Sequence, residues 1–398
     1  MLPMDPQSWL VGCWQDSMKT RLGFLASVLA PLMMGVAWAP AAPAAILPAR
    51  SEIFRLLREK RFDELEELTG ELRREKLEFY KGRSKLSRFY GFLEISREVD
   101  DHDWMKHIEM LEGWAKAEPG SATPLIALGD AYISYGWKAR GSGYADTVTE
   151  EGWRLFRERL ATARTNLEAA ERLPDKDPEV YRALMVVALG QGWSRSEMEY
   201  VFEQGVKLEP NYLQLYEAKA YHLLPRWFGQ RGDWEKFAQE AADARGGEEG
   251  EILYMVIARS QAWSEGEQFF SNTEIAYSRM KRGFEAAIKR NPESLYDINS
   301  YCYFACIAGD RETAVNLFQK INGRWESGVW RQESRFQQWQ NWALRQGDMP
   351  VESFRSRSVA RPFLLEHIKS LLTVAGAAWL AVVAVIVWAA VHNYRKSP

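Results

Sequence analysis

The sequence predicts an all-α protein in which helix pairs stack into a right-handed solenoid of about six or seven pairs. The first observation is a spacing of i, i+4, i+7, which places three side chains on one face of a helix. Two apolar triplets with this spacing stand 34 residues apart: Met280, Phe284 and Ala287, then Ala314, Phe318 and Ile321. The second observation is that no stretch alternates apolar and polar residues for long enough to predict a sheet.

Turn signals separate the helices of this repeating unit. Pro292 ends the helix of the first triplet, and Gly309-Asp310 makes the turn before the second. Two earlier triplets have the same spacing and stand 35 residues apart: Ala163, Leu167 and Ala170, then Met198, Phe202 and Gly205. A helix–turn–helix unit of about 34 residues resembles the tetratricopeptide repeat (TPR). The resemblance implies that each helix pair buries its apolar face against its neighbours.

Three further phrases extend the resemblance from about Glu52 to Phe270. They are Phe62–Leu65 (FDEL), Trp137–Tyr144 (WKARGSGY) and Leu224–Gly229 (LPRWFG). In these phrases the chain resembles a bacterial family of TPR-like proteins of unknown function. That resemblance implies a fold but no activity.

The TPR resemblance also implies where a ligand binds. TPR proteins commonly hold peptides on the face formed by the first helix of each pair. Carried onto this chain, that face comprises Asp130, Glu179, Arg182, Gln214, Glu217, Tyr221, Tyr296, Asn299 and Tyr303. The Lys/Asn clamp that some TPR proteins use for a C-terminal carboxylate is not evident, so we do not expect a chaperone-tail binder.

Residues 1–49 have the pattern of a signal peptide or an N-terminal membrane segment. Lys19 and Arg21 precede an apolar run from Leu22 to Ala39, and an Ala/Pro-rich linker with A-x-A spacing follows. A positive region, an apolar region and a small-residue exit are typical of secretion signals. An uncleaved transmembrane helix is the alternative, and Pro31 within the run argues against it.

Residues 371–391 are predicted to cross a membrane. The stretch carries no charged residue over 21 positions, enough for a helix to span a hydrocarbon core of roughly 30 Å. A juxtamembrane segment, 351–370, precedes it, and a short basic tail, 392–398, follows. The helix-pair body then occupies residues 50–350.

Two opposing signals bear on which side of the membrane the helix-pair body lies. A secretion signal followed by one span places the body in the periplasm and the tail in the cytoplasm. Arginines before the span, including Arg355, Arg357 and Arg361, outnumber the tail cations Arg395 and Lys396, and this favours a cytoplasmic body. Since long domains translocate largely regardless of charge, we expect a bacterial inner-membrane protein with a periplasmic body.

The composition excludes some classes of partner and of chemistry. A net charge of -3 gives no electrostatic reason to expect nucleic acid. The five histidines are scattered, and Cys302 and Cys306 have no third metal ligand nearby. No nucleophile elbow or phosphate-binding glycine loop is present. We therefore expect no catalytic residue, metal or cofactor.

The candidate binding site centres on the least repeat-like segment, 137–146, predicted to be an insertion between two helices. Its glycines, cations and rings could dock a peptide or an anionic group; the alternative is a long loop that only packs across neighbouring repeats. Arg226-Trp227, in a second interruption, is expected to share the site. The predicted binding residues are Trp137, Lys138, Arg140, Tyr144, Arg182, Tyr221, Arg226, Trp227, Asn299 and Tyr303.

The function predicted from these features is that of a membrane-anchored, non-enzymatic scaffold that holds a protein or peptide partner in a groove. The 17 tryptophans support an alternative, in which their rings stack on glycans and the protein binds peptidoglycan in the bacterial envelope. The simpler explanation of the tryptophans is that large rings pack helix pairs together.

Overall fold

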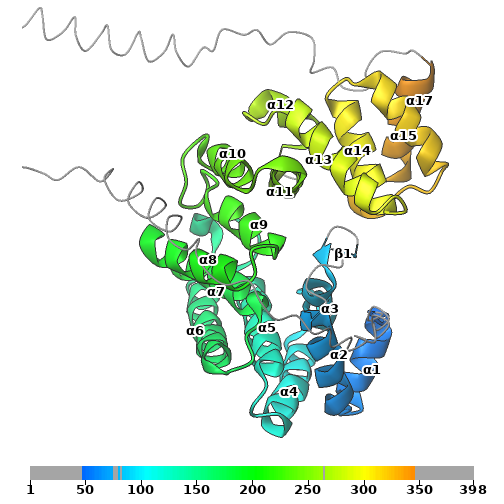
Figure 1. Ribbon diagram of the computed structural model, residues 1–398. Coiled ribbons are helices and arrows are strands. Elements are labelled where there is room, and N and C mark those ends of the chain that lie inside the picture. Colours follow the sequence, from blue (N-terminus) through cyan, green and yellow to red (C-terminus); the bar gives the residue numbers. More distant parts are fainter. Residues whose placement is uncertain (1–46, 75–78, 81–82, 263–264, 346–398) are drawn as a thin grey trace, which may run out of the picture. The chain divides into compact units, whose positions relative to one another are not determined.

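The computed structural model describes residues 47–74, 79–80, 83–262 and 265–345. This part of the chain is almost entirely helical (Figure 1). The exceptions to helix are two very short strands, β1 (Phe79–Tyr80) and β2 (Arg83–Ser84), which pair antiparallel. The prediction of an all-α protein is confirmed.

The first helices of the body pack through aromatic and leucine side chains. In the helix Asp101–Ala117, four large apolar residues follow helical spacing and are all buried: Trp104, Ile108, Leu111 and Trp114. An aspartate, Asp100, caps this helix by accepting a hydrogen bond from the Asp103 amide. The helices are α1 (Arg50–Arg58), α2 (Phe62–Arg74), α3 (Lys85–Leu93) and α4 (Asp101–Ala117).

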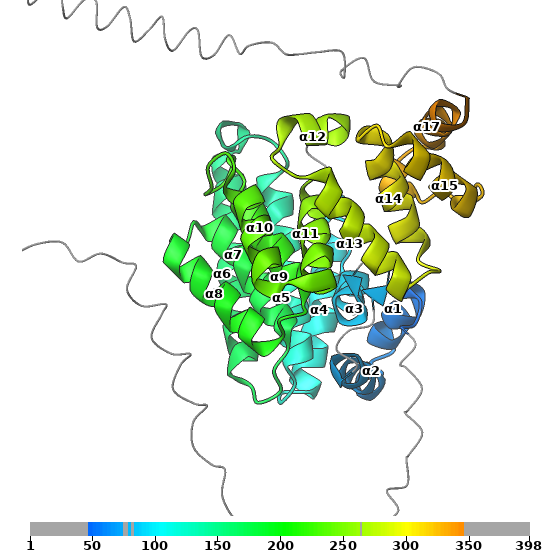
Figure 2. The same cartoon turned by 45° about the horizontal axis from the view of Figure 1, so that its top comes forward.

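The longest helix pair is formed by α5 (Ala122–Arg140) and α6 (Glu150–Arg172), which lie side by side in Figures 1 and 2. A glycine allows the close approach, because a Cβ on Gly129 would lie 2.6 Å from Leu167. The segment predicted as an insertion differs from expectation. Its first four residues form the last turn of α5, and Gly141, at φ +75°, ends the helix. A short 3₁₀ turn, η1 (Ala145–Thr147), follows before α6.

The first two of the next five helices begin with local capping signals in the sequence. Pro178 occupies the first turn of α7, and Asp177 caps it. Ser194 and Glu197 form a capping box at the start of α8. The helices are α7 (Pro178–Gln191), α8 (Arg195–Leu208), α9 (Leu213–His222), α10 (Asp233–Arg245) and α11 (Gly247–Gln261).

The C-terminal helices contain the repeat that the sequence shows most clearly. Met280 and Phe284 on α13 and Ala314, Phe318 and Ile321 on α15 are buried, as predicted from their spacing. Gly309, at φ +75°, makes the predicted turn. The elements are η2 (Gly266–Gln268), α12 (Phe269–Asn272), α13 (Tyr277–Arg290), α14 (Leu295–Ile307), α15 (Arg311–Ile321), α16 (Ser327–Trp330) and α17 (Glu333–Arg345).

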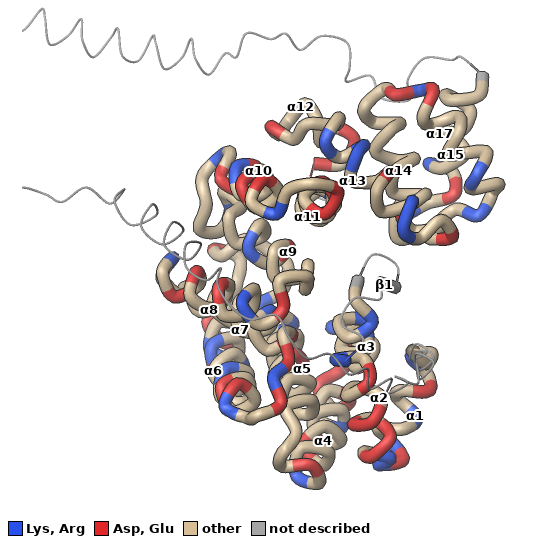
Figure 3. Tube along the Cα trace, in the orientation of Figure 1, with Lys and Arg blue, Asp and Glu red and all other residues tan. Residues whose placement is uncertain are grey.

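The main helix–helix contacts are local in sequence. Each described helix packs chiefly against helices one to three places away along the chain. Alternate helices from α5 to α13 touch in a row, and α6, α8 and α10 each pack against the members of that row that flank them. Lysines and arginines are interspersed with acidic residues along most helices (Figure 3). Several ion pairs join different helices, for example Arg279 with Asp243 at 2.8 Å.

The tryptophan rings of the described residues mainly pack the helices together. Trp104, Trp114, Trp330 and Trp339 are completely covered. Every other tryptophan in the described ranges is buried or half-buried. The simpler explanation of the high tryptophan content therefore accounts for these rings.

Several predictions concern residues that the structure does not describe. The N-terminal segment 1–49 lies outside the described ranges except for its last three residues, and 351–370, 371–391 and 392–398 lie outside them entirely. Within the described ranges, no helix has both the length and the apolar character needed to cross a bilayer.

Candidate functional site

Two segments that the sequence singles out meet in an aromatic cluster, which we define as Trp137, Trp153, Phe156, Tyr221 and Trp227. Trp137, in the last turn of α5, contacts Trp227 edge to face, with 5.9 Å between ring centroids. Trp227 also contacts Tyr221 of α9 at 5.9 Å. Trp137 packs against Phe156 of α6 at 4.9 Å. Residues 90 positions apart in the sequence therefore share one contact.

Two arginines lie on the rings of this cluster. The guanidinium of Arg140 lies 5.3 Å from the Trp137 ring and 5.5 Å from the Trp153 ring. It also donates to the Gly143 carbonyl at 3.0 Å, which holds the turn after α5 against the cluster. Arg226 is exposed and lies 5.1 Å from the Tyr221 ring. The combination of cations and ring faces suits recognition of a partner that carries both charge and apolar groups.

Two exposed rings follow cluster residues closely in the sequence, and one of them, Phe228, stacks on the His222 ring at 4.7 Å. Tyr144, in the turn after α5, is 86% exposed, and Phe228, next to Trp227, is 44% exposed. Lys138 forms an ion pair with Asp101 of α4, and this hydrogen bond lowers the pKa of the Asp101 carboxyl. Lys138 is therefore engaged with α4 rather than with the rings.

Arg182 occupies a different environment, a polar network between α5, α7 and α9. It binds Asp130 at 2.5 Å and Glu179 at 2.6 Å, and Tyr212 donates to Glu179. Burial raises the pKa of Glu179 to about 8 and that of Asp130 to about 6, although Arg182 opposes both shifts. Because both acidic groups are buried and accept hydrogen bonds from it, Arg182 is held inside the fold.

A neighbouring set of contacts continues this network. The buried Asp177 carboxylate accepts hydrogen bonds from Tyr90 at 2.7 Å and from Arg73 at 3.3 Å. The cavity beside Tyr90, His107 and Asp130 holds only about 10 Å³, which is about one water. The network thus joins α2, α3, α5, α7 and α9 and leaves no room for a substrate.

Asn299 is also placed inside the protein. It is completely buried, and its amide nitrogen donates to the carbonyls of Leu295 and Arg324. Its amide oxygen accepts from the Trp330 indole at 2.8 Å and from the Glu326 amide at 3.3 Å. In this position Asn299 fixes the segment before α16 and has no surface for a peptide.

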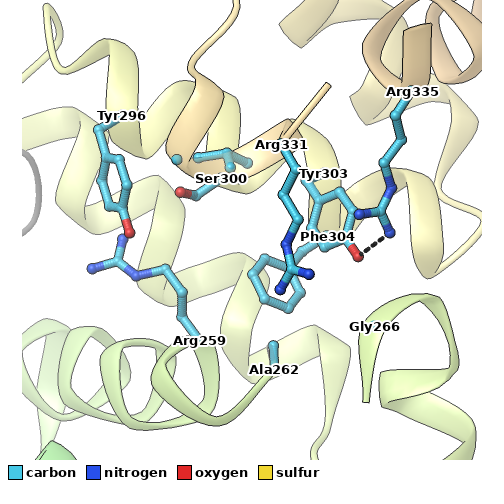
Figure 4. A pocket seen from close by; sticks show the side chains of 11 residues that line it. Arg259, Ala262, Gly266, Tyr296, Ser300, Tyr303, Phe304, Arg331 and Arg335 are labelled. Atoms are coloured by element: carbon cyan, nitrogen blue, oxygen red, sulfur yellow. Dashed lines mark hydrogen bonds between the residues drawn. The ribbon is translucent and has the colours of Figure 1, made fainter. Parts of the chain in front are cut away.

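Tyr303 lines a pocket formed by α11, α14, α16 and α17 (Figure 4). The pocket encloses about 200 Å³, and its lining contains three arginines and no acidic residue. Arg335 donates to the Tyr303 hydroxyl at 3.0 Å. Sequence reasoning missed Arg259, Arg331 and Arg335, because no motif or regular spacing relates Arg259 on α11 to the other two. Only the packing of α11 against α14, α16 and α17 brings the three arginines together.

The thiols and imidazoles do not gather into a catalytic or metal site in the described part of the chain, where no group of three potential metal ligands occurs. Cys302 and Cys306 are buried free thiols, and burial raises the pKa of Cys302. Burial lowers the pKa of both His107 and His222 to about 4, which keeps these imidazoles neutral at physiological pH.

Comparison with models of known protein families, with characterised proteins and with solved structures finds no match to this chain.

Proposed function

We propose that this protein is a membrane-anchored, non-enzymatic scaffold that binds a partner protein or peptide. The observation that carries the proposal is the aromatic cluster with its two arginines. Segments 90 residues apart converge there, and the exposed Tyr144 and Phe228 follow Trp137 and Trp227 closely in the sequence. Aromatic side chains and arginine are the residues most enriched at the energetic centres of protein interfaces.

The packing order of the helices supports the architecture we propose, a right-handed solenoid of TPR-like helix pairs. Helices that contact mainly their sequence neighbours, with alternate members in a row, are what a stacked array requires. Residues 371–391 would anchor this solenoid in a bacterial inner membrane, and a signal or membrane segment within 1–49 would direct the body to the periplasm. A cytoplasmic body is the alternative.

A protein partner is favoured over a glycan by the burial of the tryptophans. A sugar that stacks on an indole needs an open ring face, and the described tryptophans are at least half covered. The exposed aromatic rings in the described ranges are instead Tyr144, Tyr200 and Phe228. Retention of the protein on purified peptidoglycan sacculi would favour the glycan alternative.

The test is site-specific photo-crosslinking in cells. A crosslinking residue in place of Tyr144 should capture a partner, and the additional change Arg140→Ala or Arg226→Ala should reduce the yield. Tyr200, 60% exposed on α8, is the matched crosslinking position outside the cluster, and Arg172→Ala on α6 is the matched arginine control. Equal capture from Tyr144 and Tyr200, unaffected by the arginine changes, would contradict the proposal.

Topology is tested separately by protease protection in spheroplasts, with a tag placed after Pro398. Removal of the body by external protease, leaving a small tagged fragment in the membrane, is expected for a periplasmic body. Survival of the body until the membrane is broken would indicate the cytoplasmic alternative and exclude peptidoglycan as a ligand.

A further inference from the structure

The arginine-lined pocket between α11, α14, α16 and α17 contains polar groups that the fold leaves unused. The Ser300 side chain lines it, and Ser300 is only 2% exposed. Among the described residues, the Ser300 hydroxyl has no hydrogen-bond partner. Although the residue is buried, its hydroxyl oxygen remains accessible from the pocket and is available to a ligand.

The arginines of the pocket differ in their pairing. Arg259 forms an ion pair with Asp297 at 2.8 Å, and Arg335 with Glu267 at 2.9 Å. Within the described ranges, the Arg331 guanidinium has neither an ion pair nor a hydrogen bond. Arg331 and Phe304 both line the pocket (Figure 4). The pocket therefore has one uncompensated positive charge.

The backbone holds Arg331 in an uncommon conformation. Its φ of +66° lies in the left-handed region, which side-chain-bearing residues seldom adopt. Arg331 directly follows the short helix α16, whose Trp330 is completely buried and bonded to Asn299. The buried tryptophan thus fixes the position from which Arg331 extends.

The other lining groups indicate the ligand's size and polarity. Ala262, Phe304 and Val329 supply apolar surface, while the Tyr296 hydroxyl adds a second neutral donor beside Arg259 (Figure 4). A volume of about 200 Å³ is more than ten times the roughly 10–15 Å³ that one water needs. The pocket accordingly has room for a small anionic group with an apolar stem.

We propose that this pocket binds one carboxylate on a short apolar stem, with Arg331 as its ion-pair partner and Ser300 and Tyr296 as hydrogen-bond donors. A monoanion suits the site better than a phosphate dianion, because Asp297 and Glu267 already neutralise the other two arginines. The inference rests on the proposed function for the source of the group, an acidic side chain of the partner.

The proposal is tested by ligand-observed NMR on the full-length protein in detergent, with N-acetylglutamate α-amide as the probe. The neutral N-acetylglutamine α-amide should bind at least tenfold more weakly. Arg331→Ala should weaken the acidic probe roughly tenfold to a hundredfold, as loss of a charged hydrogen bond does. Ser300→Ala should weaken it less, and Arg331→Lys should restore part of the binding.

Arg172→Ala, at an arginine that is 74% exposed on α6, is the matched control and should leave probe binding unchanged. Circular dichroism of each variant verifies folding, and since Arg331 is exposed its replacement should not unfold the protein. Equal binding of the neutral and acidic probes would overturn the proposal. So would an affinity for the acidic probe that neither Arg331→Ala nor Ser300→Ala changes. Tighter binding of inorganic phosphate than of the acidic probe would also overturn it.

A third probe, N-acetylleucine, separates the two sources of a carboxylate. Stronger binding of this probe would keep the carboxylate pocket and assign it to a chain terminus instead of an acidic side chain. Crosslinking from Tyr144 does not involve this pocket. The carboxylate site can therefore fail while partner capture succeeds, and the reverse result is equally visible.

Discussion

Gly283 allows α13 to approach α11, and replacing it with alanine should push the two helices apart. A Cβ at this position would lie 2.3 Å from the Glu251 carbonyl oxygen and 2.6 Å from the Met255 Cβ. Ordinary contacts of a Cβ begin at 3.4 Å, so the helices would have to separate by about 1 Å. The closest obstacle is backbone, which cannot rotate away as the end of a side chain can.

The magnitude follows from two opposing effects. Overpacking a close helix contact costs about 1–3 kcal/mol. Alanine in a helix interior is favoured over glycine by about 1 kcal/mol. Because Gly283→Ala meets two obstacles on α11, we expect the overpacking to prevail and the free energy of unfolding to fall by up to about 2 kcal/mol.

A glycine with open space provides the matched control. Gly113 is inside α4, and a Cβ there would have no neighbour within 4 Å. Gly113→Ala should therefore raise the free energy of unfolding by up to about 1 kcal/mol, from helix propensity alone. The same chemical change is expected to have opposite signs at the two sites.

Urea unfolding of the full-length chain in detergent, followed by circular dichroism, measures both variants. The midpoint should move to lower urea for Gly283→Ala and to slightly higher urea for Gly113→Ala. If Gly283→Ala proved as stable as Gly113→Ala, the reasoning about the α11–α13 approach would be wrong.

Three further predictions concern the buried polar groups. Burial raises the pKa of Glu179 to about 8, so the folded state retains a proton that the unfolded state releases near pH 4.5. The free energy of unfolding should therefore fall as the pH rises from 4.5 through 8. In a series of urea unfolding experiments at different pH values, Glu179→Gln should show a weaker dependence of stability on pH. Asn299→Ala leaves the Trp330 indole without its acceptor and should lower the free energy of unfolding by about 1–3 kcal/mol in the same assay. Asn316→Ala, at an exposed position, should lower it little. Equal effects of the two changes would contradict the role given to Asn299. Cys302 and Cys306 should resist a thiol reagent until urea unfolds the chain, and rapid labelling of both in native protein would show that α14 is less protected than its burial indicates.

Local patterns in the sequence were sufficient to predict the helices. The triplets ending at Ala170 and Ile321 have the helical period, and their buried faces in α6 and α15 match it. The turn at Gly309 was equally predictable, because glycine adopts positive φ without strain. The prediction of an insertion over 137–146 was wrong at its start, because Trp137–Arg140 contain no helix breaker and continue α5 until Gly141 ends it.

The candidate sites depended on tertiary structure to different degrees. Trp137 and Trp227 were recognisable as interruptions of the repeat, but their contact requires α5 and the turn after α9 to meet. Asn299 had the helical position of a groove residue, yet α16 covers it and uses its amide. Helical period identifies the face on which a side chain lies, but only the neighbouring helices decide whether that face is covered.

The sequence by itself determined the fold class and the helix period, because both follow from local spacing of apolar residues and turn formers. It also marked Trp137, Tyr221 and Trp227 of the aromatic cluster, but not Trp153 and Phe156. Only the tertiary structure decided that Arg182 forms ion pairs within a buried network and that Arg331 and Ser300 line the same pocket. These outcomes depend on contacts between residues far apart in the chain, and a local pattern carries no information about which distant side chain will supply a partner.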